Sequence, residues 1–293
     1  MSATGLQKHT EIVNRSAPTA TVVITLVAAL GLSGRPAQQT APADNARGPV
    51  RAIVTKIQRA DYEGDRAALK RLHDELASFA ENKELGSRVQ YWRGFALWRR
   101  AMNGFNDNVE PADLQADLKQ ALGEFDDAVR KDPGFGDAKI GALSCVSLTG
   151  ASVRMSTKDP ARMQELLAQW RQRRKDAETA APENPRLFWV LGPDMFYIPP
   201  ERGGGQAKAI EMYEKGLELI RKHRSTASDL LEPSWGEPEL LMNLAYSSLS
   251  KSEPNLDAAE QYGRSALELV PYWHYLRDIL MPRIREAKAE QQR

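Results

Sequence analysis

Three features of the sequence predict an all-α fold. Apolar residues recur at spacings of three and four along most of the chain after Val50, which is the period of an amphipathic helix. After the first 32 residues the sequence has no run of β-branched residues with the alternating period of a strand. Breaks that contain proline or several glycines separate the helix-period segments. We therefore expect a series of helices joined by short connections.

The helical period is clearest in seven segments. These are residues 67–79, 91–102, 114–129, 163–170, 207–220, 240–249 and 258–270. Residues 50–60 and 65–79 are interpreted as a helix pair around the turn at Gly64 and Asp65, and residues 272–293 as a final helix with a largely polar tail. A polar outer face is what the last helix of an array requires. With the intervening pieces, we expect about eleven helices in one array.

The composition is that of a soluble globular protein without a strong overall charge. Hydrophobic residues make up 42% of the chain and charged residues 27%, and the formal net charge is +1. Such a balance gives no attraction to nucleic acid or to an acidic membrane surface, so we expect no nucleic-acid partner. The single cysteine, Cys145, excludes an internal disulfide.

The N-terminal segment predicts export. Lys8 and Arg15 precede an uncharged apolar stretch at residues 19–32. This stretch is shorter than the ~20 residues that span a bilayer as a helix, and a short apolar core behind basic residues is typical of a secretory signal peptide. Residues 1–32 are therefore interpreted as a signal peptide or, if they are retained, as an N-terminal anchor. The first alternative predicts a periplasmic or secreted protein, the second a protein attached to the membrane by residues 19–32.

Two regions follow this leader. Residues 33–49 are rich in alanine, proline, glycine, glutamine and threonine and lack hydrophobic periodicity, which predicts a flexible linker. Residues 50–293 are expected to form the helical domain.

A short pattern recurs within the helical domain. Alanine, a large residue, alanine and proline occupy Ala121, Phe125, Ala128 and Pro133. The same offsets recur, with some replacements, at Ala259, Gly263, Ala266 and Pro271 and at Ala209, Tyr213, Gly216 and Arg221. Small residues at such positions let two helices approach closely, and the large residue fills the space in the neighbouring unit.

These recurrences resemble the second helix and terminal proline of the tetratricopeptide repeat (TPR). First helices match in part, because Leu191-Gly192, Leu244-Ala245 and Arg93-Gly94 fall where that repeat has its leucine–glycine pair. The resemblance covers about residues 88–271. It implies a right-handed α-solenoid of about four degenerate helix pairs, with flanking helices at the N- and C-termini.

The sequence departs from the repeat in three places. Residues 103–113 and 149–159 are expected to lengthen the turns within two pairs, and residues 223–237 are inserted between units. Such insertions lie on one face or edge of a solenoid.

A glycine-rich break raises the question of a phosphate loop. Gly203, Gly204 and Gly205 precede a helix whose first N–H groups could bind an anion. No Gly-Lys-Ser/Thr follows and no strand precedes them, so we interpret them as a turn. Together with Pro199 they resemble a turn of exported bacterial TPR proteins.

Signatures of catalysis and of metal binding are absent from the sequence. The four histidines, His9, His73, His223 and His274, are far apart and lack metal-ligand spacing. Cys145 lies in an apolar helical stretch and is expected to be a small core residue. The sequence therefore predicts a protein that is not an enzyme, with no catalytic residue, metal or cofactor.

The family resemblance also predicts a binding groove. In TPR arrays the first helices of the pairs line a concave face, and the register above selects the residues on it. The predicted groove residues are Arg88, Tyr91, Phe95, Trp98, Arg99, Arg186, Trp189, Phe196, Tyr197, Met242 and Tyr246. Aromatic residues beside arginine are typical of binding hot spots. The aromatic residues could equally belong to the core, or the chain's own terminal helices could fill the groove.

The function that follows is binding. We expect a scaffold of the cell envelope that holds a protein or peptide partner in this groove. The alternative is a structural or assembly subunit of an envelope complex, anchored by its leader. Repeat scaffolds share a fold while they bind unrelated ligands, so the sequence does not identify the partner.

Overall fold

Helices account for all the regular secondary structure in the described part of the chain. The computed structural model describes residues 43–156, 159–222, 229–250 and 253–293, so the predicted leader lies outside the described residues. The α-helices are α1 (Ala43–Glu63), α2 (Arg66–Glu75), α3 (Gly86–Asn106), α4 (Pro111–Lys131), α5 (Gly136–Ser156), α6 (Pro160–Ala180), α7 (Pro185–Tyr197), α8 (Gln206–Lys222), α9 (Glu237–Leu249), α10 (Leu256–Leu269) and α11 (Met281–Gln291). Two 3₁₀ segments, η1 (Leu76–Phe79) and η2 (Pro200–Arg202), and a π-helical segment, η3 (Tyr275–Leu280), complete the series. The all-α prediction is confirmed.

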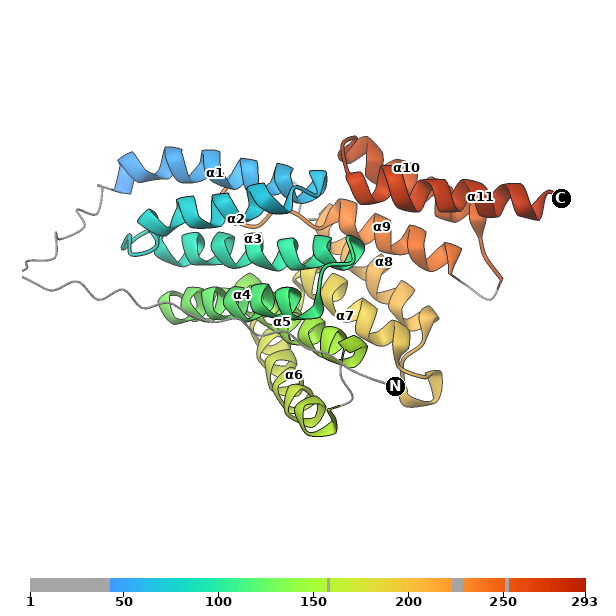
Figure 1. Cartoon of the computed structure of the whole chain (residues 1–293), viewed down its shortest axis with the longest axis horizontal. Helices are drawn as coiled ribbons and strands as arrows, with labels where there is room; N and C mark the ends of the chain where they lie inside the picture. Colours follow the sequence, from blue (N-terminus) through green and yellow to red (C-terminus); the bar gives the residue numbers. More distant parts are fainter. Residues whose placement is uncertain (1–42, 157–158, 223–228, 251–252) are drawn as a thin grey trace, which may run out of the picture. The chain divides into compact units, whose positions relative to one another are not determined.

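Successive helices pack in pairs, as in an α-solenoid. The pairs are α1 with α2, α3 with α4, α5 with α6, α7 with α8, and α9 with α10 (Figure 1). The first helices of successive pairs also contact one another, α1 with α3, α3 with α5, α5 with α7, and α7 with α9. We call these five helices the inner row. The site described below lies along this row, since α3, α7 and α9 contribute to its wall.

The repeated small and large residues pack as the sequence predicts. A Cβ added at Gly94 of α3 would lie 3.0 Å from the ring of Phe125 on α4, and one at Gly141 of α5 would lie 2.5 Å from the same ring. At Gly192 of α7 a Cβ would approach the ring of Tyr213 on α8 to 2.0 Å. The large residues of α4 and α8 therefore lie where a glycine leaves room for them.

The turn between α1 and α2 is also confirmed. Gly64 has a positive φ of 73°, which suits glycine. The side chain of Asp65 accepts a hydrogen bond of 2.9 Å from the N–H of Ala68 and so caps α2.

Two sequence predictions about helix ends are wrong. Helix α1 begins at Ala43, so residues 43–49 are not part of a flexible linker. Ala46 and Val50 are 1% and 0% exposed, and this packing outweighs the helix-breaking tendency of Pro49. Helix α3 continues to Asn106, and α5 to Ser156, so their insertions lengthen the helices rather than the turns.

A single hydrophobic cluster runs through the described helices from α1 to α11. A small second cluster, Val146, Val153 and Leu166, lies between α5 and α6. Among the described residues, no helix is both long and apolar enough to cross a membrane.

Candidate functional site

Four of the five groove residues predicted on α3 are buried, and the fifth, Arg88, is half-buried. Tyr91, Phe95 and Trp98 expose 1%, 1% and 0% of their surface. Their rings pack against one another, with centroids 6.3 Å apart for Tyr91 and Phe95 and 5.7 Å apart for Phe95 and Trp98. These three side chains therefore belong to the core.

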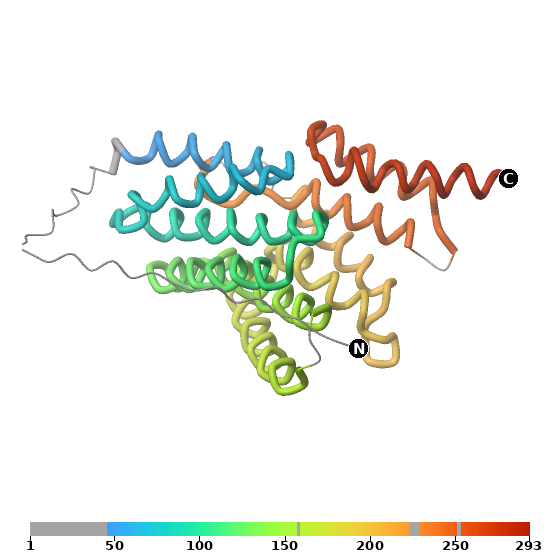
Figure 2. Tube along the Cα trace, in the orientation of Figure 1, coloured from blue at the N-terminus to red at the C-terminus, as the bar shows by residue number. Residues whose placement is uncertain are grey.

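A short segment of the chain itself covers these aromatic residues. Residues 229–236, which we call the strap, precede α9, and their orange trace passes behind α2 in Figure 2. The ring centroid of Trp235 lies 5.6 Å from the ring centroids of Phe95 and Trp98, and 5.3 Å from that of Trp189. Leu231 and Trp235 are 1% and 6% exposed. The strap thus fills part of the inner row with apolar side chains.

Hydrogen bonds fix the strap along the inner row. The indole N–H of Trp92 donates to the carbonyl oxygen of Leu231 at 2.8 Å, and the indole N–H of Trp235 donates to the hydroxyl of Tyr91 at 2.8 Å. Arg186 of α7 donates through Nη1 to the carbonyl oxygen of Trp235 at 3.1 Å. The strap is therefore held through its main chain as well as through its aromatic ring.

Ion pairs add to this attachment. Asp229 pairs with Arg47 and, at 3.0 Å, with Arg51, both on α1. Glu232 pairs with Arg88 of α3 at 2.7 Å. The strap therefore contacts α1, α3 and α7, which are far from it in the sequence.

These contacts change the interpretation of five predicted groove residues. Arg88, Tyr91, Phe95, Trp98 and Arg186 do lie along the inner row, but the chain's own strap occupies their side of it. The insertion that contains the strap was expected at a face or edge of the array, and only the terminal helices were expected as internal occupants of the groove. The burial of two apolar side chains, Leu231 and Trp235, explains why the strap packs against the inner row instead.

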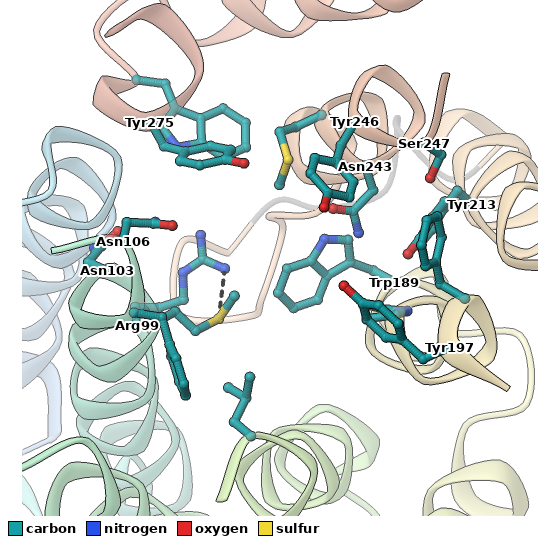
Figure 3. A pocket seen from close by; sticks show the side chains of 17 residues that line it. Arg99, Asn103, Asn106, Trp189, Tyr197, Tyr213, Asn243, Tyr246, Ser247 and Tyr275 are labelled. Atoms are coloured by element: carbon teal, nitrogen blue, oxygen red, sulfur yellow. Dashed lines mark hydrogen bonds between the residues drawn. The ribbon is translucent and has the colours of Figure 1, made fainter. Parts of the chain in front are cut away.

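The inner row is open beyond Trp189. A pocket with a volume of about 280 Å³ lies there, lined by α3, α7, α8, α9 and η3 (Figure 3). Aromatic side chains dominate its lining. They include Trp189, Phe196 and Tyr197 of α7, Tyr213 of α8, Tyr246 of α9 and Tyr275 of η3. The pocket is thus largely apolar, with hydroxyl groups at its wall.

Six of the eleven predicted groove residues line this pocket. They are Arg99, Trp189, Phe196, Tyr197, Met242 and Tyr246. Tyr197 is the most accessible of them, at 72% exposed. The pocket therefore brings together six of the predicted residues, of which Trp189 also contacts the strap.

Eleven of the 17 residues that line the pocket were not predicted from the sequence, among them Tyr213, Asn243 and Tyr275. Tyr213 was expected only as the large packing residue of its repeat, and Asn243 lies between two predicted residues on α9. Tyr275 comes from the segment after the last repeat, whose return to the inner row no local pattern indicates. The helical spacing of Asn243 from Tyr246 was the one available signal.

Arg99 is the one charged residue among those that line the pocket in the described chain. Its Nε donates to Asp61 at 2.8 Å, and its Nη2 lies 3.8 Å from Glu239. The hydroxyl of Tyr62 donates to Glu239 at 2.8 Å. All three charged groups are buried, so two carboxylates face a single guanidinium away from water.

Burial sets the titration of these carboxylates. Desolvation raises the pKa of Asp61 above its usual range, although Arg99 opposes the shift. The pKa of Glu239 is raised in the same way, and the nearby Asp61 raises it further. Because Arg99 already faces two carboxylates, the wall behind the pocket does not favour a further anion.

Two hydrogen-bond donors of the pocket have no acceptor among the described residues. The indole Nε1 of Trp189 and the amide Nδ2 of Asn243 are both buried without a partner. In Figure 3 the Trp189 indole projects into the pocket between Arg99 and the tyrosines, close to Asn243 in this view. Since unpaired buried donors are unfavourable, an acceptor supplied from outside would stabilise this wall.

A second hollow of about 290 Å³ lies on the other side of Tyr197, between α5, α6 and α7. Its charged residues are Arg154 and Asp194. Burial raises the pKa of Asp194, although this carboxylate accepts hydrogen bonds from Ser147 and Trp170. Both oxygens of this carboxylate already have donors from the chain. The hollow therefore presents mainly apolar side chains.

The glycine-rich break is a turn, as predicted. Gly203 and Gly205 have positive φ values of 82° and 96°. The N–H groups of Gly203, Gly204 and Gly205 donate to the carbonyl oxygens of Pro200, Pro199 and Met195. Because the chain itself uses these donors, they do not form an anion site.

Two further observations concern reactive groups. Within the described ranges, no cluster of His, Cys, Asp or Glu side chains could hold a metal ion. Cys145 is 0% exposed, and burial raises the pKa of its thiol, as expected of a core residue.

The chain is thus an α-solenoid with a pocket lined largely by aromatic side chains. No protein-family model matches the chain, and no curated protein matches its sequence. Among solved structures, the fold is similar to that of the HusA haemophore from Porphyromonas gingivalis. That match has a TM-score of 0.53 at 18% identity and covers 73% of this chain and 98% of the haemophore.

A second solved structure is a thermophilic TPR protein of Thermus thermophilus. It matches with a TM-score of 0.48 at 20% identity, over 83% of this chain and 98% of that protein. Because its TM-score is the higher of the two, only the likeness to the haemophore carries information. At such low sequence identities, that likeness concerns the fold alone.

Proposed function

We propose that the protein is a non-enzymatic binding scaffold that holds a segment of another protein in the pocket between α3, α7, α9 and η3. One observation carries the proposal. Aromatic side chains from five helical segments, α3, α7, α8, α9 and η3, converge on the part of the inner row that the strap leaves open. Aromatic residues are the side chains that most often dominate binding energy at interfaces.

The strap supports a protein segment as the ligand. Residues 229–236 show that the inner row accommodates a non-helical piece of chain, through an aromatic ring and main-chain carbonyl groups. The pocket continues the same surface, because Trp189 contacts the strap and also lines the pocket. An outside segment would therefore occupy the row next to the internal one.

Site-specific cross-linking tests the proposal. A photoreactive phenylalanine derivative replaces Tyr197, which is 72% exposed at the pocket, or Met155, which is 76% exposed and lines neither hollow. In the source cell we expect a defined protein adduct from position 197 and none from position 155. The adduct is then identified by mass spectrometry and its partner purified.

The purified partner permits a quantitative check. Tyr246→Ala removes a half-buried ring of the pocket wall, whereas Tyr262→Ala removes a half-buried ring of α10 outside the pocket. We expect the first change to weaken binding at least about tenfold, as for a central aromatic anchor, and the second to leave it unchanged. Equal adducts from both cross-linking positions, or equal affinities of the two variants, would refute the proposal.

We also propose that the scaffold acts in the cell envelope, after export directed by residues 1–32. The support is the short apolar core at residues 19–32 behind Lys8 and Arg15. Sequencing the N-terminus of the protein from its source cell tests this. A start after residue 32 supports a released periplasmic or secreted protein, whereas a retained leader with the protein in the membrane fraction supports the anchored subunit instead.

A further inference from the structure

We infer that the pocket recognises an aromatic side chain of an uncharged protein segment, whose main-chain carbonyl accepts hydrogen bonds from Trp189 and Asn243. The inference rests on the proposed function and specifies its ligand. It follows from the way the protein binds its own strap, from the unpaired donors and from the charges behind the pocket.

The strap is the internal example of this recognition. Trp235 meets Trp98 and Trp189 with ring planes inclined at 63° and 85°, the edge-to-face arrangement that aromatic pairs favour. The carbonyl of the same residue accepts a hydrogen bond from Arg186, and that of Leu231 accepts one from an indole N–H. Ring and carbonyl are thus recognised together.

The pocket offers the same two elements without an occupant from the described chain. Phe196 and Tyr246 provide rings, with centroids 6.3 Å apart. The indole N–H of Trp189 and the amide of Asn243 are donors without an acceptor. A carbonyl oxygen has two lone pairs and can accept from both donors.

Charge distinguishes a carbonyl from a carboxylate as the acceptor. Arg99 is already shared by Asp61 and Glu239, so the buried charge behind the pocket is not positive when both carboxylates are ionised. A carboxylate ligand would place a third anion next to this group. A neutral amide carbonyl satisfies the donors without that repulsion, which favours an internal peptide segment over a free C-terminus.

Size is consistent with a single side chain. The volume of about 280 Å³ lies just below the range of about 300–1,000 Å³ in which proteins bind drug-sized molecules. One aromatic residue with its neighbouring peptide group is therefore the ligand that we expect to fill the pocket.

Three small probes test this ligand on the full-length protein. N-acetyl-tryptophanamide has the ring and a neutral amide, N-acetyl-tryptophan replaces that amide by a carboxylate, and N-acetyl-leucinamide lacks the ring. We expect the first probe to bind and to shift the indole ¹⁵N–H resonance of Trp189. The other two should bind at least about tenfold more weakly, a difference measured by titration.

Two variants assign the binding to the donors. Asn243→Leu removes the amide at similar size, and we expect it to weaken binding of N-acetyl-tryptophanamide at least about tenfold; Tyr262→Ala is the control outside the pocket. Circular dichroism verifies that both remain helical. Trp189→Phe keeps a ring but removes the N–H, and serves as the second variant if Asn243→Leu does not fold.

Three outcomes would overturn the inference: equal binding of the amide and the carboxylate probe, no shift of the Trp189 resonance, or a crystal structure in which the Asn243 amide oxygen accepts from Trp189. Failure of the probes together with a specific adduct from position 197 leaves the proposed function intact. If the amide probe binds but no protein adduct forms, the chemistry proposed for the pocket is supported, and the proposal of a protein partner is refuted.

Discussion

The indole rings of Trp189 and Trp235 meet edge to face, with centroids 5.3 Å apart and planes inclined at 85°. Trp189 belongs to α7 and lines the open pocket, whereas Trp235 belongs to the strap that fills the neighbouring part of the inner row. This contact therefore lies at the boundary between the internally occupied surface and the surface that we propose for a partner.

The strap offers two adjacent leucines with opposite environments. Leu231 is 1% exposed and Leu230 is 53% exposed. We expect Leu231→Ala to lower the free energy of unfolding by about 2–5 kcal/mol, because it leaves a cavity against α3. Leu230→Ala should change it by no more than about 0.5 kcal/mol. Denaturant unfolding of both variants measures the difference, and equal effects would mean that the strap does not pack as described.

The close approach of α7 and α8 predicts a strong effect of one methyl group. A Cβ at Gly192 would lie 2.0 Å from a ring carbon of Tyr213, so Gly192→Ala forces the two helices apart. We expect it to destabilise the protein by about 1–3 kcal/mol or more. Gly123 of α4 has no atom within 4 Å of the added Cβ, and Gly123→Ala should stabilise by about 0.5–1 kcal/mol. Thermal unfolding of the pair gives opposite signs if the packing is correct.

The buried carboxylates predict a pH dependence of stability. The folded-state pKa values of Asp61 and Glu239 are raised, so the folded state binds protons more readily than the unfolded chain. Their contribution to stability is full below about pH 4, the unfolded pKa range, and is lost as the pH rises through the folded-state values. When the pH is raised from 5 to 7, the Glu239→Gln variant should therefore lose less stability than the wild-type protein. Denaturant unfolding at both pH values measures this difference.

Glu124 provides the opposite sign. Burial alone would raise its pKa, but hydrogen bonds from His73 and Arg93 lower it below the usual range. Its contribution is therefore present above about pH 4.3, the unfolded value, and is lost as the pH falls through the folded-state value. Relative to wild type, Glu124→Gln should lose less stability on acidification below pH 4. If Glu124→Gln and Glu239→Gln changed the pH dependence of stability in the same direction, this assignment would be contradicted.

Cys145 is expected to be inert in the folded protein. It is fully buried, and burial raises the pKa of its thiol, so little thiolate is available to an external reagent. A thiol-reactive disulfide reagent should label it rapidly in guanidinium chloride and many-fold more slowly in native buffer. Fast labelling of the native protein would show that α5 opens readily.

The helix pairs could be predicted from the sequence because their packing depends on local residues. Phe125, for example, fits between Gly94 and Gly141, and the spacing of such residues is visible in the sequence. Helix ends were less accessible, since the burial of Ala46 and Val50 extends α1 through a segment that looks like a linker.

The candidate site could be predicted only in part. Trp189, Tyr197 and Tyr246 follow from the register of the inner row, and the structure places them around one pocket. The strap could not be predicted, because its position depends on contacts with residues more than a hundred positions away, such as that between Trp92 and Leu231. Local periodicity carries no information on such long-range contacts.

The strap also limits how this array could change in length. In most solenoids each unit contacts only its neighbours, so units can be added or removed one at a time. Here Asp229 reaches α1, Glu232 reaches α3 and Trp235 reaches α7, each at a set distance along the row. Inserting or deleting a helix pair between α3 and α7 would move these anchor points out of register. The number of units between them is therefore part of what the sequence must keep constant.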